Sequence, residues 1–199
     1  MKLILASNNA HKLREFKQIL SPLGIEIISQ SEAGCHFEVD ETGTTFEENA
    51  YLKAVAVTEK TGLPAVADDS GLEVDALGGA PGIYSARYTG NHEDTDEDRL
   101  NLVLKNLGDN PQRSARFVSC ISCTFPNGDR IDTRGECEGA IQDHATGENG
   151  FGYDPIFRPE GYDCSMAELT ADQKNAISHR GKSLTKFYEE LRNYLHADK

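Results

Sequence analysis

The sequence predicts a mixed α/β protein, because signals for strands and helices alternate along its 199 residues. Short apolar runs bounded by turn residues indicate buried strands, and apolar residues at helical spacing indicate the helices between them. Strand signals occur in both halves, and no linker, repeat or low-complexity tract separates the halves. We therefore expect residues 1–199 to form one domain, with room for two closely packed lobes that share a sheet.

The N-terminal part of the chain predicts a strand, a helix and a second strand. Lys2–Ala6 is a short apolar run followed by the polar turn Ser7-Asn8-Asn9. A helix is expected over His11–Leu20, where the apolar residues Leu13, Phe16 and Leu20 share one face. Ile25–Ser29 is the next candidate strand.

A second helix is predicted from its capping residues. Thr45 and Glu48 match a capping box, so we expect a helix from this point to about Lys60. Gly62 suits the position after its last turn, and Pro64 prevents continuation. Leu63–Ala67 then predicts a buried strand that runs into Asp68-Asp69 and a Ser70-Gly71 turn.

The second half predicts a loop, a helix, a hairpin and a final helix. A glycine-rich loop covers Gly78–Gly90, and the next helix begins after Thr95 and ends at Gly108. Two strands, at Ala115–Thr124 and Arg130–Ile141, flank an Asn-Gly turn typical of hairpins. The last helix carries apolar residues at helical spacing, namely Leu184, Phe187, Leu191 and Leu195.

The composition limits the possible partners. A net charge of -13 disfavours broad binding to nucleic acids or anionic membranes, so we expect neither as a partner. No apolar run approaches the ~20 residues of a membrane span, and the N-terminus lacks the pattern of a signal peptide. These features predict a cytoplasmic protein. A small polyanion that arrives with a divalent cation remains compatible with the charge.

Five cysteines, an odd number, indicate free thiols in a reducing compartment. Cys120 and Cys123 form a C-x-x-C pattern, but they lie in a predicted strand, where residues three apart point to opposite faces. We therefore expect ordinary core or surface residues there.

The first candidate site is Ser7-Asn8-Asn9-Ala10-His11-Lys12, where a strand leads into a helix. Free backbone N–H groups at a helix start favour a phosphate, and Lys12 adds a positive charge. The segment lacks the glycines of a Walker loop, so by itself it is better explained as an Asn-rich turn with a surface lysine.

The second candidate is acidic. Glu38, Asp40 and Glu41 precede the second helix, and Asp68-Asp69 follow a buried strand. Carboxylates are preferred ligands of Mg²⁺, and a carboxylate beside the metal can orient or deprotonate a water. A solvated acidic turn explains Glu38 and Asp40 equally well, whereas the setting of Asp69 favours function.

Three further segments carry weaker signals. The Gly78–Tyr88 loop places Arg87 either near a phosphate or in a structural ion pair. In Gly147–Pro155, glycines alternate with Phe151 and Tyr153, which fits either base stacking or core packing beside a turn. The basic cluster formed by Lys174, His179 and Arg180 can donate to phosphate or to a purine carbonyl, or can be a solvated helix end.

Taken together, these segments resemble the inosine triphosphate pyrophosphatase family, the house-cleaning dITP/XTP pyrophosphatases. The resemblance spans nearly the whole chain, and its joint pattern is far more specific than any one piece. It rests on Ser7-Asn8-Asn9-x-x-Lys12-x-x-Glu15, Glu41-Thr42-Gly43, Phe46-x-Glu48-Asn49-Ala50-x-x-Lys53-Ala54, Ala67-Asp68-Asp69-Ser70-Gly71-Leu72, Gly79-Ala80-Pro81-Gly82-x-Tyr84-Ser85-Ala86-Arg87, Gly150-Phe151-Gly152-Tyr153-Asp154-Pro155 and Ser178-His179-Arg180-Gly181.

The resemblance implies a role for individual residues. Asp69 matches the family's proton acceptor and, with Glu41, its metal ligands, which implies Mg²⁺ as cofactor. The implied substrate contacts are Ser7, Asn8, Asn9, Ala10, His11 and Lys12 at the phosphates, Lys53 beside them, Ser70, and then Phe151, Gly152, Tyr153, Asp154, Lys174, His179 and Arg180. The stacking partner of the base is left open between Phe151 and Tyr153.

The resemblance also implies an elongated mixed β-sheet flanked by helices, with two lobes and a central cleft, and a homodimer. The implied reaction converts ITP, dITP or XTP into the monophosphate and pyrophosphate. Two alternatives remain: a Maf-type pyrophosphatase acting on pyrimidine or modified nucleotides, and a catalytically silent nucleotide sensor.

Overall fold

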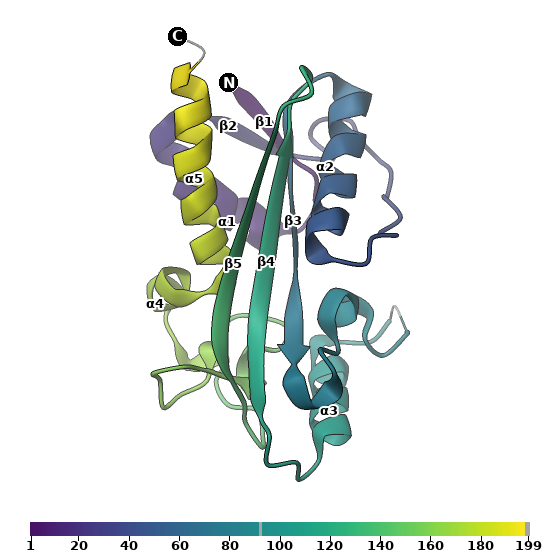
Figure 1. Cartoon of the computed structure of the whole chain (residues 1–199), viewed down its shortest axis with the longest axis vertical. Coiled ribbons are helices and arrows are strands. Elements are labelled where there is room, and N and C mark those ends of the chain that lie inside the picture. The colour runs from purple at the N-terminus through teal and green to yellow at the C-terminus, as the bar shows by residue number, and fades with distance from the viewer. Residues whose placement is uncertain (92, 198–199) are drawn as a thin grey trace. The chain divides into compact units, whose positions relative to one another are not determined.

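The computed structural model describes residues 1–91 and 93–197 and contains a six-stranded sheet flanked by helices. The strand order is β2-β1-β3-β4-β5-β6. The strands are β1 (Lys2–Leu5), β2 (Glu26–Ser29), β3 (Ala65–Val74), β4 (Ser114–Thr124), β5 (Arg130–Ile141) and β6 (Phe157–Pro159). β1 is parallel to β2 and to β3, and β6 is antiparallel to β5, so the predicted mixed sheet with flanking helices is confirmed (Figure 1).

The helices are α1 (Ala10–Leu20), α2 (Phe46–Thr61), α3 (Asp96–Leu107), α4 (Ala171–Ile177) and α5 (His179–Ala197). The first three begin and end close to the predicted positions and α5 contains the predicted apolar residues, whereas α4 was not predicted. Thr45 and Thr95 cap α2 and α3, and Gly62 follows α2 in the left-handed region at φ 66°. The predicted capping box of α2 is only half formed, because Glu48 accepts hydrogen bonds from Thr44 instead of from the Thr45 backbone.

The chain forms two compact units. The first contains Met1–Asp69, Ser119–Arg134 and the chain from Ser183, and the second contains Ser70–Val118 and Gly135–Lys182. The strands β3, β4 and β5 each contribute residues to both units.

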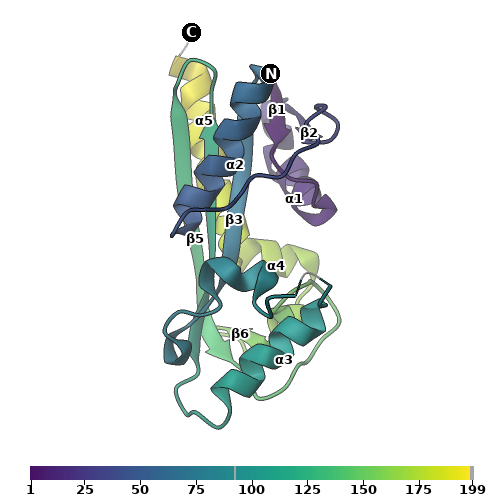
Figure 2. The same cartoon turned by 90° about the vertical axis from the view of Figure 1, so that its right-hand side faces the viewer.

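In the first unit the sheet is covered on both faces. Leu3 and Leu5 of β1 pack in a cluster with Phe16 of α1 and with Leu184, Phe187 and Leu191 of α5. Ile4 and Ala6 belong to a second cluster with Ala54 and Val57 of α2. This alternation along β1 places α1 and α5 on one face and α2 on the other, as Figure 2 also shows. A strand covered on both faces is expected to be a continuous apolar run, and Leu3–Leu5 is one.

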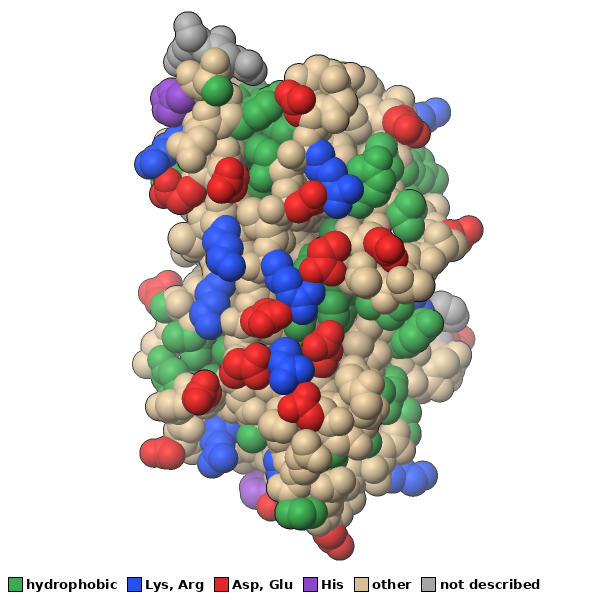
Figure 3. Space-filling view, in the orientation of Figure 1, with side chains coloured by type: hydrophobic (Ala, Val, Ile, Leu, Met, Phe, Trp, Pro, Cys, Tyr) green, Lys and Arg blue, Asp and Glu red, His purple; other side chains and the backbone are tan. Residues whose placement is uncertain are grey.

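The core of the second unit is formed by α3 and by the parts of β3, β4 and β5 that belong to this unit. Leu100, Val103 and Leu107 of α3 contact Leu72 and Val74 of β3 in one buried cluster. On the exposed side of β4 in this unit, Arg116 pairs with Glu138 at 2.9 Å and with Asp75 at 3.1 Å. Figure 3 shows acidic and basic side chains mixed together on one face of the molecule.

One element differs clearly from its prediction. The strand that we expected to end at Ala67 continues through Asp68, Asp69, Ser70 and Gly71 to Val74, so the predicted Ser-Gly turn is wrong. Each of the two buried aspartates in this strand is paired with a lysine, as described below.

The cysteines are free thiols, as predicted, and four of the five are buried. Cys123 packs in the cluster with α5, whereas Cys120 lies near Arg134, so the two point to opposite faces of β4. Burial raises the pKa of both thiols. In the part of the chain that the structure describes, no helix combines the length and apolarity needed to span a bilayer.

Candidate active site

The junction between β1 and α1 is held by asparagine side chains. Asn9 is the N-cap of α1, and its Oδ1 accepts from the backbone N–H groups of His11 at 2.9 Å and Lys12 at 3.2 Å. The Ser7 hydroxyl accepts from the Asn9 N–H at 3.1 Å, and Asn8 Oδ1 accepts from Ser31. The expectation of free N–H groups at this helix start is therefore wrong for His11 and Lys12, because the cap already binds them.

Lys12 points from α1 to the buried carboxylate of Asp68. Its Nζ lies 2.9 Å from Asp68 Oδ2 and 3.1 Å from the Asp68 carbonyl oxygen. The other carboxylate oxygen, Oδ1, accepts from the Ser119 hydroxyl at 2.6 Å. The sequence predicted Asp68 only as part of an acidic pair, and it did not predict Ser119, which comes from a strand 51 residues further along the chain.

Lys53, on α2, joins the two predicted metal ligands. Its Nζ lies 2.8 Å from Glu41 Oε1 and 2.6 Å from Asp69 Oδ1. It also donates to the Asp68 carbonyl oxygen at 3.3 Å, the same atom that binds Lys12. Carboxylates from two distant stretches of chain therefore lie within reach of one cation, and two ammonium groups converge on one carbonyl oxygen. We call Lys12, Glu41, Lys53, Asp68 and Asp69 the charged cluster.

Burial and charge act against each other in the charged cluster. Burial raises the pKa of the Asp69 carboxyl above its ordinary value, and the positive charge of Lys53 only partly opposes this. For Lys53, burial alone would lower the pKa, but the charges of Asp69 and Glu41 outweigh it, so the pKa is raised. The lysine is therefore firmly protonated, and Asp69 is a stronger base than an exposed aspartate.

The carboxylates of the charged cluster fit a divalent cation. The second oxygen of Asp69, Oδ2, is buried and has no hydrogen-bond partner among the described residues. A buried acceptor without a donor is costly, and a metal ion would satisfy it. Within residues 1–91 and 93–197, no group of three or more His, Cys, Asp or Glu side chains is arranged to hold a metal. Two carboxylates suit Mg²⁺, which commonly takes its remaining ligands from phosphate and water.

A second group of predicted residues surrounds Phe151 in the other unit. Asp154 Oδ2 accepts from Lys174 Nζ at 2.6 Å and from the Phe151 N–H at 3.0 Å. The Lys174 ammonium lies 4.6 Å from the centre of the Phe151 ring, and the Arg180 guanidinium lies 5.7 Å from it. Both are within cation–π range of the ring. Arg180 also donates to the Ser70 hydroxyl at 2.9 Å. We call Phe151, Asp154, Lys174 and Arg180 the Phe151 group.

Two neighbours of the Phe151 group are part of the core. Tyr153 is buried and its hydroxyl donates to the Ser85 carbonyl at 2.7 Å, whereas Phe151 is partly exposed. His179 is also buried, and its ring stacks on Phe117 at 4.8 Å. The Gly152 N–H donates to Asp96 Oδ2 at 2.7 Å.

Arg87, for which the sequence left a phosphate contact and a structural ion pair open, contacts a residue of its own loop. Its guanidinium lies 5.3 Å from the ring centre of Tyr84 within the same loop, which fits a structural role in this loop.

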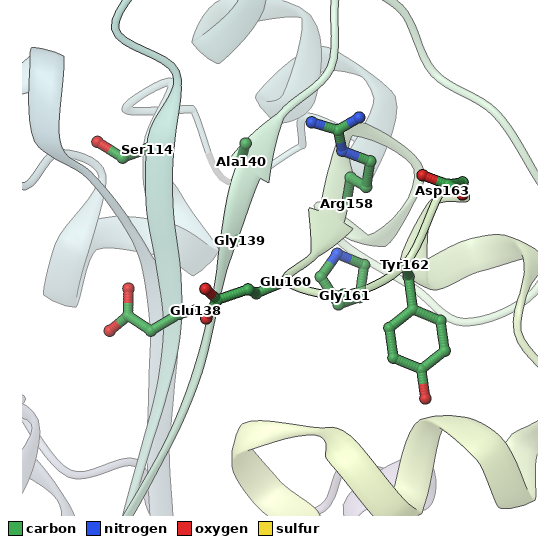
Figure 4. Close-up of a pocket in the computed structure, with 10 residues that line it drawn as sticks. Ser114, Glu138, Gly139, Ala140, Arg158, Glu160, Gly161, Tyr162 and Asp163 are labelled. Carbon is green, nitrogen blue, oxygen red and sulfur yellow. The ribbon is translucent and has the colours of Figure 1, made fainter.

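A large cavity of the second unit contains none of the predicted site residues. It has a volume of about 760 Å³ and is lined by residues of β5, β6 and the loop after β6, with Ser114 at the start of β4 (Figure 4). Three carboxylates, Glu138, Glu160 and Asp163, line it together with Arg158. Like charges would repel a polyphosphate there, so this cavity is a poor candidate for the site that the motifs predict.

Comparison with known proteins places these residues in a family. A model described as the Ham1 family matches residues 3–190. A dITP/XTP pyrophosphatase from Desulforamulus reducens is 48% identical over 201 residues, covering 100% of both chains, and one from Clostridium perfringens is 45% identical, covering 98% of both. The solved Ham1 protein of Staphylococcus aureus superposes with a TM-score of 0.90 at 43% identity, covering 98% of this chain and 100% of that one. The resemblance seen in the sequence is therefore confirmed, and this chain belongs to the Ham1 family.

Proposed function

We propose that this protein hydrolyses deaminated purine nucleoside triphosphates, ITP, dITP and XTP, to the monophosphate and pyrophosphate. The observation that carries the proposal is the convergence of Lys12 and Lys53 on the Asp68 carbonyl while Lys53 bridges Glu41 and Asp69. Relatives that are 45–48% identical over nearly their full length are named dITP/XTP pyrophosphatases, which supports the same substrates.

In this proposal, the charged cluster and the segment Ser7–Lys12 bind the triphosphate. Glu41 and Asp69 would hold Mg²⁺, which would neutralise charge on the phosphate oxygens. Lys12 and Lys53 supply positive charge from two helices, where it stabilises charge that develops on departing pyrophosphate. Hydrogen bonds hold both ammonium groups in place, and Lys53 already donates to three oxygens, so its ammonium would exchange one of these partners to bind a phosphate directly.

Asp69 is the group that we assign to the attacking water. Its carboxylate would accept a proton as the water attacks the α-phosphorus and the bond to pyrophosphate breaks. Burial raises its pKa, which makes it a better base, and the positive charge of Lys53 partly opposes this rise. Asp68 is directly bound by Lys12 and Ser119, so we assign it to positioning Lys12.

The Phe151 group is assigned to the base. The Phe151 ring offers a stacking surface, and Arg180 and Lys174 lie close to it as donors. A 6-oxo purine presents an acceptor at the position where adenine presents an amino donor, so donors aimed there would reject ATP. Sites that read such hydrogen bonds discriminate by roughly 10⁴–10⁵.

The deciding measurement is pyrophosphate release with Mg²⁺ from ITP, dITP, XTP, ATP, GTP, UTP and dTTP. We expect release from the three deaminated purine nucleotides and little from ATP. ATP turnover as fast as that of ITP would contradict the assignment, and preferred turnover of UTP or dTTP would favour a Maf-type enzyme. Binding without release would indicate a sensor. Chelation of the metal is expected to stop the reaction, and added Mg²⁺ to restore it.

We further propose that the protein acts in the cytoplasm as a homodimer. Its free thiols fit a reducing compartment.

A further inference from the structure

The loop that carries Glu41 is attached to the first turn of α2. Asn49 Oδ1 accepts from the Gly43 N–H at 2.9 Å. The next loop residue, Thr44, donates its N–H and its hydroxyl to Glu48 Oε2, at 2.6 and 2.9 Å. Two consecutive helical side chains therefore bind two consecutive loop residues, and Glu41 lies only two residues before Gly43.

Asn49 is an unusual choice for its position. It is fully buried, and its Nδ2 has no hydrogen-bond partner among the described residues. An unpaired buried donor costs roughly 1–3 kcal/mol, which an apolar side chain would avoid. Packing alone therefore does not account for an asparagine, whereas its bond to Gly43 does. Asn49 also lies one helical turn before Lys53, whose ammonium binds Glu41, so both face the Glu41 loop.

Gly43 shows how closely the loop approaches the helix. A Cβ at this position would lie 2.6 Å from Asn49 Oδ1 and 2.7 Å from Glu48 Cβ. Both distances are shorter than non-bonded atoms tolerate, so any larger residue would push the loop away from the helix. The hydrogen bond from the Gly43 N–H to Asn49 therefore requires glycine at position 43.

We propose that Asn49 is a positioning residue for the metal site, which holds Glu41 in place through the Gly43 N–H. This inference rests on the proposed function, because it takes Glu41 as a metal ligand. Residues that orient a metal ligand without touching the metal commonly change metal affinity by roughly 10–100-fold when they are replaced.

The test measures Mn²⁺ binding to the full-length protein by electron paramagnetic resonance, with no nucleotide present. Asn49→Leu keeps the branched shape but removes both polar atoms, and Gly43→Ala displaces the loop from the opposite side of the same contact. We expect each to weaken Mn²⁺ binding by roughly tenfold or more. The double variant is expected to bind Mn²⁺ as tightly as the single variant with the lower affinity, because both changes remove the same contact.

Thr58→Val is the matched control. Thr58 is a buried polar residue on the same helix, and its hydroxyl bonds to Thr124, away from the Glu41 loop. We expect it to lower the melting temperature while leaving Mn²⁺ affinity within twofold. Wild-type affinity in both Asn49→Leu and Gly43→Ala, or an equal loss in Thr58→Val, would overturn the inference. Glu41→Gln separates the two proposals: if it leaves Mn²⁺ binding unchanged, the metal assignment itself is wrong.

Discussion

The two carboxylate oxygens of Asp69 have different surroundings. Oδ1 is bound by the Lys53 ammonium at 2.6 Å, whereas Oδ2 is buried with no partner in the described part of the chain. Asp68, the residue before it, instead contacts Lys12 and Ser119. Adjacent aspartates on one strand thus face different partners because successive side chains of a strand point to opposite faces. This difference separates a candidate base from a positioning carboxylate.

Asp69→Asn is expected to retain nucleotide binding and lose most turnover. The amide has nearly the same shape but is a poor base and a poor metal ligand, and general base catalysis alone contributes roughly 10²–10⁴-fold. Pyrophosphate release measures turnover, and equilibrium binding of a non-hydrolysable ITP analogue measures affinity. Near-wild-type turnover in a variant with normal metal content would remove Asp69 from this role.

At the scale of the element, α5 depends on one apolar stripe. Leu184, Phe187 and Leu191 are fully buried and pack with β1 and α1. The helix supplies much of one layer of the first unit, so its packing is expected to dominate the stability of this unit.

Phe187→Ala is therefore expected to destabilise the protein by roughly 3–5 kcal/mol, because it leaves a cavity in the core. Glu190→Ala, on the exposed side of the same helix, should change stability by less than about 0.5 kcal/mol. Urea denaturation of both variants gives the comparison. Equal effects would show that α5 does not anchor the core in the way described.

The N-terminus of α3 should respond to acid. Asp98 Oδ2 accepts from the Thr95 N–H at 2.8 Å and from its hydroxyl at 2.7 Å, and these bonds lower the pKa of the Asp98 carboxyl below its ordinary 3.8. A lowered folded-state pKa means that the bonds stabilise the fold above pH 3.8 and that this contribution is lost as the pH falls through the folded-state value.

In Asp98→Asn this contribution to the pH dependence should be absent. Denaturation measured from pH 6 down to pH 2.5 should therefore show a smaller loss of stability on acidification in the variant than in the wild type. Parallel curves for the two proteins would mean that the capping box adds no pH-dependent stability.

At the scale of the whole molecule, the net charge of -13 sets how the protein meets other molecules. Such a charge opposes non-specific binding to nucleic acids, and a nucleotide must be attracted locally by Lys12, Lys53 and the basic residues near Phe151. The basic residues assigned to substrate binding are therefore local exceptions on an acidic protein.

The homodimer that the family resemblance implies is a direct prediction about the assembly. One chain has a mass of 21.8 kDa, so light scattering after gel filtration is expected to give about twice that value. The mass should stay constant over a range of loading concentrations if the dimer is stable. A single species with the mass of one chain at all concentrations would contradict it.

The sequence by itself determined α1, α2, α3 and α5, the hairpin and the family. Local rules control these features: apolar spacing defines α1, α2, α3 and α5, the capping threonines begin α2 and α3, and Asn127-Gly128 forms the turn between β4 and β5. Because family motifs are short and ordered along the chain, they identified the candidate residues without any knowledge of their positions in space.

Only the tertiary structure decided how those residues are used. It extended β3 through the two aspartates, placed Asn9 on the N–H groups expected to be free, and buried Tyr153 while leaving Phe151 partly exposed. Lys12 and Asp68 are 56 residues apart in sequence, yet they form an ion pair. The physical reason is that the partners of these buried charges lie on distant segments of the chain. Which segments meet depends on how the sheet and its helices pack, and a local sequence pattern does not predict this.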